Sequence, residues 1–198
     1  MVLPNQLTVL RIILTPVFLF LFISGDATLV QISLVLFLIA ALTDWYDGWL
    51  ARKFNYITDW GKFMDPLADK ILTSTAFFGL VALGVLNLWL VVIIVFRDAL
   101  ITLLRALADY KKVSFSTSRS AQWKTFIQMA FLYYLLIVYT LRTHQKFSVD
   151  YKWLFDILLN PNLVFYIMLA VTLFTAFTGI TYLISNRFLI KKLFKNEN

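Results

Sequence analysis

The chain has 198 residues, of which 61% are hydrophobic and only 15% are charged, and its mean hydropathy is +0.79. Soluble domains average roughly 45–50% apolar and about 25% charged residues, so this composition excludes an ordinary soluble protein and predicts an integral membrane protein. In so apolar a chain the net charge of +7 does not indicate nucleic-acid binding, and the absence of cysteine excludes disulfides and thiolate chemistry.

Six apolar segments are long enough to cross a membrane, since one span needs about 20 residues. In chain order they are expected at residues 7–24, 29–47, 61–83, 88–108, 121–141 and 163–184. An N-terminal juxtamembrane segment precedes the first, and residues 142–162 are expected to lie at the membrane interface. The predicted fold is therefore all-α, a single polytopic membrane domain over residues 1–198 with six transmembrane helices.

Basic residues gather on one side of this predicted topology. The opposite side carries only Arg142, Lys146 and Lys152. By the positive-inside rule the basic side is cytoplasmic and holds both termini, which agrees with an even number of spans. The residues on the basic side are Arg52, Lys53, Lys62, Lys111, Lys112, Arg119, Arg187, Lys191, Lys192 and Lys195.

Four aspartates interrupt the apolar sequence where the second segment ends and the third begins. Asp44 and Asp47 are three residues apart, and Asp65 and Asp69 are four apart, so each pair projects from one helix face. Carboxylates near the bilayer are costly and repel one another, and a divalent cation among them is the simplest compensation. All-oxygen ligation suits Mg²⁺ or Mn²⁺, and two such ions held by shared carboxylates are typical of phosphoryl transfer.

Two other interpretations of these acids remain open. A structural ion-pair network would need more local basic partners than the sequence offers. An ion pathway, as in a divalent-cation carrier, would need polar groups distributed across the membrane, whereas these acids gather at one end of two helices.

Small residues accompany the acids and complete a longer pattern. Gly48, Ala51 and Gly61 either let helices pack closely or leave room for a ligand beside the metals, and both can hold. Together with Arg52, the motif D-x2-D-G-x2-A-R-x8-G-x3-D-x3-D is matched at all eight fixed positions within residues 44–69. This pattern resembles the signature of the CDP-alcohol phosphatidyltransferases.

The resemblance implies a six-helix membrane fold, a homodimer, and two metals beneath the pyrophosphate of a CDP-linked lipid. Asp44, Asp47 and Asp65 would be the main metal ligands. Asp69 would bind metal and also act as the general base on the acceptor hydroxyl. The CDP site would comprise Gly48, Ala51, Arg52, Gly61, Asn5 and Thr8, although capping of the first helix also explains Asn5.

Three basic residues outside the motif bear on the acceptor. Arg97 and Arg105 are eight residues apart, about 80 degrees on a helix, so they share a broad face. Lys124 falls in the first turn of the fifth segment. Together they could bind a phosphomonoester. The alternative is snorkelling to the interface, which suits Arg105 and Lys124 better than Arg97, half-way along its segment.

Residues 4–11 and the sequences T-D-W-Y-D-G, D-P-L-A-D-K and R-D-A-L-I-T-L-L-R are similar to the bacterial phosphatidylglycerophosphate synthases of this family. That similarity implies transfer of phosphatidyl from CDP-diacylglycerol to sn-glycerol 3-phosphate at the cytoplasmic face of the bacterial inner membrane. Cardiolipin synthase and phosphatidylinositol-phosphate synthase are the alternatives. One departure concerns the acceptor: members commonly carry Gly-Lys-x-Lys-Thr where this chain has Ala121-Gln122-Trp123-Lys124-Thr125.

Overall fold

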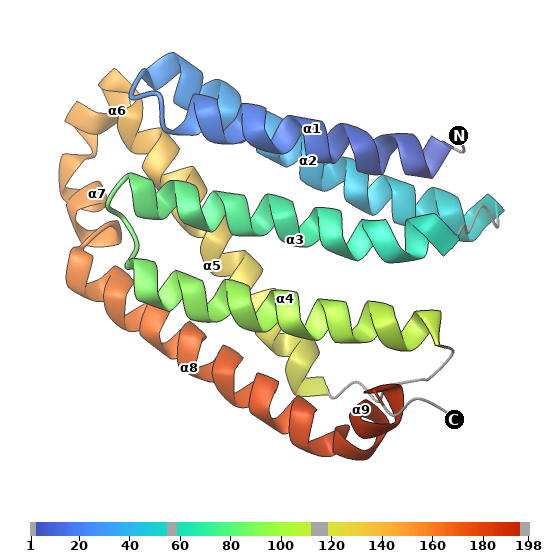
Figure 1. Ribbon diagram of the computed structural model, residues 1–198. Helices are drawn as coiled ribbons and strands as arrows, with labels where there is room; N and C mark the ends of the chain where they lie inside the picture. The colour runs from blue at the N-terminus through green and yellow to red at the C-terminus, as the bar shows by residue number, and fades with distance from the viewer. Residues whose placement is uncertain (1–2, 55–58, 112–118, 195–198) are drawn as a thin grey trace.

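The computed structural model describes residues 3–54, 59–111 and 119–194, and its regular structure in these ranges is helical, with no strand (Figure 1). Some side chains within them are not described: 3–5, 44–45, 47–52, 54, 59–60, 62–63, 110, 119–121 and 191–194. The all-α prediction is confirmed for this part. The helices are α1 (Leu3–Phe22), α2 (Ala27–Phe54), α3 (Asp59–Ala82), α4 (Leu88–Tyr110), α5 (Arg119–Thr143), α6 (Gln145–Asp150), α7 (Lys152–Leu158), α8 (Pro161–Ser185) and α9 (Arg187–Phe194).

Glycine and aspartate set the tight turns between the long helices. Gly25, between α1 and α2, has φ +77°, and Gly84, between α3 and α4, has φ +71°, a region that side chains with a Cβ rarely adopt. Asp26 then begins α2, because its Oδ1 accepts hydrogen bonds from the backbone N–H of Thr28 (2.8 Å) and Leu29 (3.0 Å). Both turns lie where the sequence predicts them.

The second and third helices extend further than the apolar pattern predicts. The second segment is predicted to end at residue 47 and the third to begin at residue 61, whereas α2 continues to Phe54 and α3 begins at Asp59. Leucine, alanine, arginine and lysine are good helix formers, so loss of hydrophobicity does not end the backbone hydrogen bonding. The residues 44–54 therefore stand on one continuous helix.

In the described part of the chain, six long helices close into a ring. α1 packs on α2 and α3, α3 on α4, α4 on α8, and α5 packs on both α8 and α2. α5 crosses the bundle obliquely (Figure 1). Phe18 fills the centre between α1 and α2, with its ring centroid 5.3 Å from that of Phe22 and 5.2 Å from that of Phe37. Such close packing, rather than hydrophobic burial, drives association of helices in lipid.

The helix ends are divided between the two ends of the bundle. The start of α1, the end of α2, the start of α3, the end of α4, the start of α5 and α9 lie together at one end, and α6 and α7 lie at the other (Figure 1). The distribution of basic residues in the sequence predicts the same grouping, with the connections after the second and fourth segments on the side of both termini. The segment expected at the interface forms α6 and α7, in which Trp153 is exposed and Phe155 is buried.

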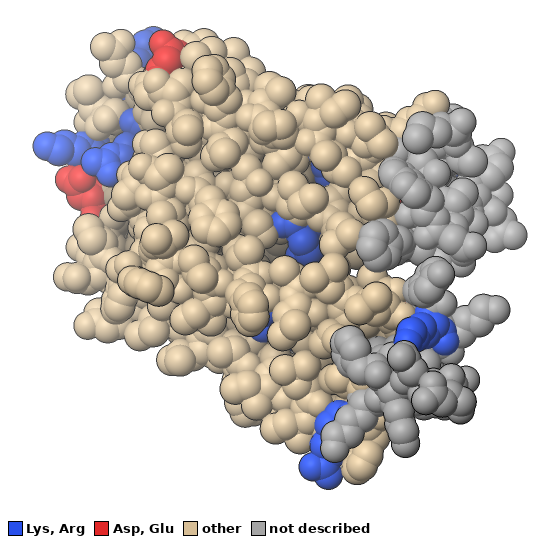
Figure 2. Space-filling model, in the orientation of Figure 1, with Lys and Arg blue, Asp and Glu red and all other residues tan. Residues whose placement is uncertain are grey.

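The outer surface is apolar, as expected of a protein in a lipid bilayer. Two stretches, Gln122–Thr143 and Lys152–Ser185, are long and apolar enough to cross a membrane, and Gln6–Phe22 and Ala27–Thr43 are shorter apolar helices. Figure 2 shows charged side chains toward the ends of one face and a broad uncharged middle, interrupted by a few recessed basic side chains. Large aromatic side chains face outward, among them Phe20, Trp89, Phe96, Phe126 and Phe177. Six spans remain a prediction.

Candidate functional site

Of the four aspartates in the motif (the aspartate quartet), Asp65 and Asp69 have described side chains, and both lie on one face of α3. Asp65 and Asp69 are one turn apart and partly exposed. Thr8 of α1 is fully buried, and its Oγ1 donates a 2.5 Å hydrogen bond to Oδ1 of Asp65. Asp69 contacts the ammonium of Lys70, with Nζ 3.4 Å from Oδ2. The α1 helix therefore orients the carboxylate of Asp65, and Lys70 balances the negative charge of Asp69.

Helix α1 is also tied to α2 close to the first aspartate pair. Arg11 is buried, and its Nε donates to the backbone carbonyl of Ala40, 3.3 Å away and one turn before Asp44. The backbones of Asp44 and Asp47 lie on α2, but their side chains are outside the described residues. Contacts from α1 thus fix the two helices that carry the quartet relative to each other.

Most of the predicted CDP-binding residues fall in the same undescribed region. Gly48, Ala51 and Arg52 lie on α2 and Asn5 lies in the first turn of α1, with their side chains outside the described ones, while Gly61 is buried in the first turn of α3. Because α1 begins at Leu3, Asn5 lies inside the helix, and its interpretation as the N-cap is wrong. The nucleotide roles of all these residues stay predictions.

The described donors suit a hard divalent cation. Asp65 and Asp69 supply carboxylate oxygens, and the hydroxyl of Thr8 holds one of them in place. Among the described side chains, no three acids, histidines or cysteines gather into a metal site. The described oxygens therefore fit one half of the predicted ligand set, and the other half is on α2.

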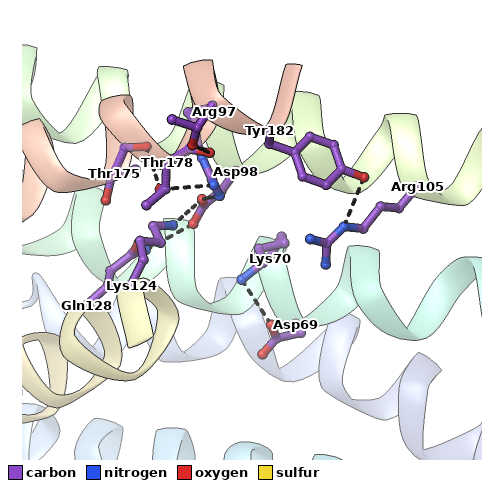
Figure 3. Close-up of polar contacts among 11 residues, drawn as sticks. Asp69, Lys70, Arg97, Asp98, Arg105, Lys124, Gln128, Thr175, Thr178 and Tyr182 are labelled. Carbon is purple, nitrogen blue, oxygen red and sulfur yellow. Dashed lines mark hydrogen bonds and ion pairs between the residues drawn. The ribbon is translucent and has the colours of Figure 1, made fainter. Parts of the chain in front are cut away.

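A cavity of about 370 Å³ opens between α3, α4 and α5, and its lining includes Lys70, whose ammonium contacts Asp69. The described part of its wall contains three basic side chains, and Figure 3 shows Lys70 of α3 between Asp69 and the charged side chains of α4. The structure thus brings Arg97 and Arg105 together, as their spacing predicts. The lining residues are Lys70, Arg97, Asp98, Ile101, Thr102, Arg105, Gln122, Thr125 and Phe126.

Helix α8 holds Arg97 from behind. The Nη2 of Arg97 donates to Oγ1 of Thr178 at 3.2 Å. At the next position, Gly179 lies so close that an added Cβ would be 2.8 Å from Cγ and 3.0 Å from Nε of Arg97. The arginine side chain therefore lies directly across the glycine, in a space that any larger residue would fill.

The same helix orients Arg105 one turn further along. Its Nε donates to the hydroxyl of Tyr182 at 3.4 Å, and its guanidinium carbon is 5.1 Å from the centre of that ring. Sequence reasoning missed these contacts because α8 is generically hydrophobic. The available signal was its stripe of polar and small residues, Thr175, Thr178, Gly179 and Tyr182.

The third predicted phosphate ligand, Lys124, lies behind the cavity wall. Only 1% of its side chain is exposed, and its ammonium contacts Oδ1 of Asp98, which is 5% exposed. Asp98 also accepts from Nη1 of Arg97 at 3.1 Å and from Nε2 of Gln128 at 3.1 Å. The charge of Lys124 is thus matched by a carboxylate, and direct contact with a ligand stays a prediction.

Comparisons with known proteins show the family of this chain. The CDP-alcohol phosphatidyltransferase family model matches residues 1–178, and the chain belongs to that family. A Rickettsia typhi relative is 37% identical over 135 residues, 68% of this chain and 76% of its own length. One from Bacillus subtilis is 41% identical over 115 residues (52% and 60%), and one from Mycoplasma pneumoniae is 32% identical over 168 residues (76% and 74%). All three are named CDP-diacylglycerol–glycerol-3-phosphate 3-phosphatidyltransferase.

The buried charge cluster gives a prediction for stability. Asp98→Asn removes the carboxylate that contacts Lys124 and Arg97, and breaking a buried pair on one side costs roughly 3–5 kcal/mol. We expect a clearly lowered unfolding midpoint in detergent micelles. The double variant Asp98→Asn/Lys124→Met should lose less, because it leaves no uncompensated lysine.

The matched control is Asp109→Asn, an exposed aspartate near the end of the same helix, which should leave the unfolding midpoint unchanged. Equal midpoints for the Asp98 and Asp109 variants would contradict a structural role for the cluster.

Proposed function

We propose that this chain transfers the phosphatidyl group of CDP-diacylglycerol to sn-glycerol 3-phosphate, forming phosphatidylglycerol phosphate and releasing CMP. The observation that carries the proposal is the cavity of about 370 Å³, with Lys70, Arg97 and Arg105 in its wall, beside the carboxylate of Asp69. Its cations suit a small anionic acceptor. Membership of the family and the names of the three relatives support the same reaction.

Arg97 and Arg105 would hold the phosphate of the acceptor. A guanidinium offers several donors in a planar fork that fits phosphate oxygens, and one face of each arginine is already fixed by Thr178 or Tyr182. Lys124 would act through Asp98, which holds Arg97 in place. The donors are thus oriented before the substrate arrives, which lowers the entropic cost of positioning it.

The chemical step needs a base, correct alignment and stabilisation of the developing negative charge. The 1-hydroxyl oxygen of glycerol 3-phosphate would attack the phosphorus that bears diacylglycerol, and the bond from that phosphorus to the bridging oxygen of the pyrophosphate would break. CMP leaves with the bonding electrons, and Asp69 takes the hydroxyl proton. Positioning and charge stabilisation account for most of the catalysis in phosphoryl transfer.

The donor side would use the aspartate motif. Asp44, Asp47, Asp65 and Asp69 would hold two divalent cations, Mg²⁺ or Mn²⁺, which when bound stabilise negative charge on the pyrophosphate oxygens. Thr8 would keep Asp65 in its ligating orientation. The other residues proposed around the CDP group are Gly48, Ala51, Arg52, Gly61 and Asn5.

The protein would span the bacterial inner membrane six times, as a homodimer surrounded by lipid, with the cavity open to the cytoplasm. The apolar exterior supports this placement, and so do the exposed basic residues Lys53, Lys111 and Arg187, which lie where α2 and α4 end and α9 begins. It also suits the substrates, because CDP-diacylglycerol arrives through the bilayer and glycerol 3-phosphate arrives from water.

An acceptor panel tests the proposal. Proteoliposomes with CDP-diacylglycerol and Mg²⁺ should convert labelled glycerol 3-phosphate into labelled lipid and release CMP, with less turnover on phosphatidylglycerol or inositol phosphate. Release of CMP with phosphatidylglycerol alone would point instead to a cardiolipin synthase. Leakage of divalent cations without CMP release would point to a carrier.

Substitution of the proposed base should separate chemistry from binding. Asp69→Asn removes the proton acceptor but leaves three aspartates for the metals, so we expect kcat to fall by roughly 10²–10⁴-fold. Equilibrium binding of CDP-diacylglycerol, measured with Mg²⁺ present, should be largely retained. Complete loss of donor binding in this variant would contradict the assignment of Asp69 as the base.

Displacement of Arg97 without loss of its charge should weaken acceptor binding. In Gly179→Ala the new Cβ would overlap Arg97, and loss of one charge-assisted hydrogen bond corresponds to roughly a tenfold rise in KM for glycerol 3-phosphate. The KM for CDP-diacylglycerol should stay unchanged. Both constants come from steady-state assays of CMP release.

The control is Gly79→Ala on α3, where the added Cβ would lie 2.9 Å from the ring of Phe22, away from the cavity. This variant introduces similar crowding, so it should lower stability without raising the acceptor KM. Equal increases in KM for the two variants would show that crowding, and not the position of Arg97, is responsible.

A further inference from the structure

Lys70 is a charged residue of the cavity that ends the sequence D-P-L-A-D-K, but neither the aspartate motif nor the arginine spacing gives it a role. It follows Asp69 on α3, and the described lining of the cavity comprises Lys70 from this helix and residues of α4 and α5. Its side chain is 22% exposed, in contrast to the 1% exposure of Lys124. Of these two lysines, Lys70 is the one that a ligand in the cavity can reach.

The contacts of Lys70 place it between two parts of the site. On one side its ammonium is 3.4 Å from Oδ2 of Asp69, whose side chain is 36% exposed. On the other side it shares the cavity wall with Arg97 and Arg105, and Figure 3 shows it between Asp69 and the charged side chains of α4. An ammonium has three donors, so contact with Asp69 still permits a contact with a ligand.

The charges of the cavity favour an anionic ligand near Lys70. Asp98 is the acidic residue of the described lining, and its single negative charge already faces two positive charges, those of Lys124 and Arg97. Arg105 and Lys70 then add positive charge that Asp69, exposed beside the cavity, balances only in part. A phosphomonoester, which carries close to two negative charges at neutral pH, would complete this balance.

We propose that Lys70 binds the phosphate of the acceptor together with Arg97 and Arg105, and thereby sets the position of the acceptor hydroxyl relative to Asp69. This inference rests on the proposed function and adds a specificity-determining residue to it. Because Lys70 contacts Asp69, a ligand held at its phosphate by Lys70 would lie close to the proposed base. A substrate without the phosphate lacks that anchor.

The alternative is that Lys70 only balances the charge of Asp69. In that case its removal would change the chemical step and leave acceptor binding intact. Binding of the donor pyrophosphate is a second alternative, and its loss would raise the KM for CDP-diacylglycerol. The three roles therefore predict different kinetic constants.

The test is steady-state kinetics of the full chain in proteoliposomes, with glycerol 3-phosphate and with glycerol as acceptors. We expect Lys70→Met to raise the KM for glycerol 3-phosphate by at least about tenfold, as for loss of a charge-assisted hydrogen bond. The KM for CDP-diacylglycerol should be unchanged, and the preference for glycerol 3-phosphate over glycerol should fall. Lys70→Arg should restore most of the acceptor affinity.

Two controls exclude trivial causes. Arg187→Met removes one exposed positive charge at the same end of the bundle, outside the cavity lining, and should leave every constant unchanged. Lys70→Gln keeps a polar side chain of similar length, so agreement with Lys70→Met shows that charge is what matters. Size-exclusion profiles of all the variants should match that of the wild type.

Direct binding of glycerol 3-phosphate, measured by calorimetry, separates this inference from the proposed function. Wild-type protein that turns over, with an unchanged acceptor KM in Lys70→Met, would overturn the role of Lys70 and leave the function standing. Wild-type protein that makes no labelled lipid but binds glycerol 3-phosphate through Lys70 would overturn the proposed function and leave the binding role of Lys70 standing. A rise in the donor KM alone would assign Lys70 to the pyrophosphate.

Discussion

The acceptor side of this protein depends on the ion pairs and the hydrogen bond that the carboxylate of Asp98 forms. This carboxylate lies within an apolar bundle, where a lone charge is very costly. Contacts with Lys124, Arg97 and Gln128 compensate the cost of burying this charge. The cluster joins α4 to α5, and it leaves the guanidinium of Arg97 fixed at the cavity wall. A structural charge pair thus becomes part of the support of a binding site.

The same principle of support recurs around the other functional side chains. Thr8 holds Asp65, Thr178 and Gly179 hold Arg97, and Tyr182 holds Arg105. Each supporting residue comes from α1 or α8, whereas the residues it supports come from α3 or α4. Since phosphoryl transfer requires position and charge more than covalent chemistry, a rigid ring of helices with such contacts is well suited to it.

The sequence predicted correctly which residues share a helix face, because the helical repeat relates residues that are close in the chain. The helical spacing of Asp65 and Asp69 puts them on one face of α3, and the eight-residue spacing of Arg97 and Arg105 puts both in one cavity wall. Sequence reasoning went wrong at the end of α2, since hydropathy marks the limit of the apolar segment and not the last hydrogen-bonded turn.

The sequence by itself determined the membrane class, the helical architecture, the aspartate motif and the family, because these depend on composition and on local periodicity. Only the tertiary structure decided which lysine lines the cavity. Lys124 of α5 and Asp98 of α4 are 26 residues apart in the chain and meet through their side chains, which removes Lys124 from the wall, while Lys70 reaches it from α3. Such contacts between helices depend on their rotation and crossing, which no spacing within a single helix encodes.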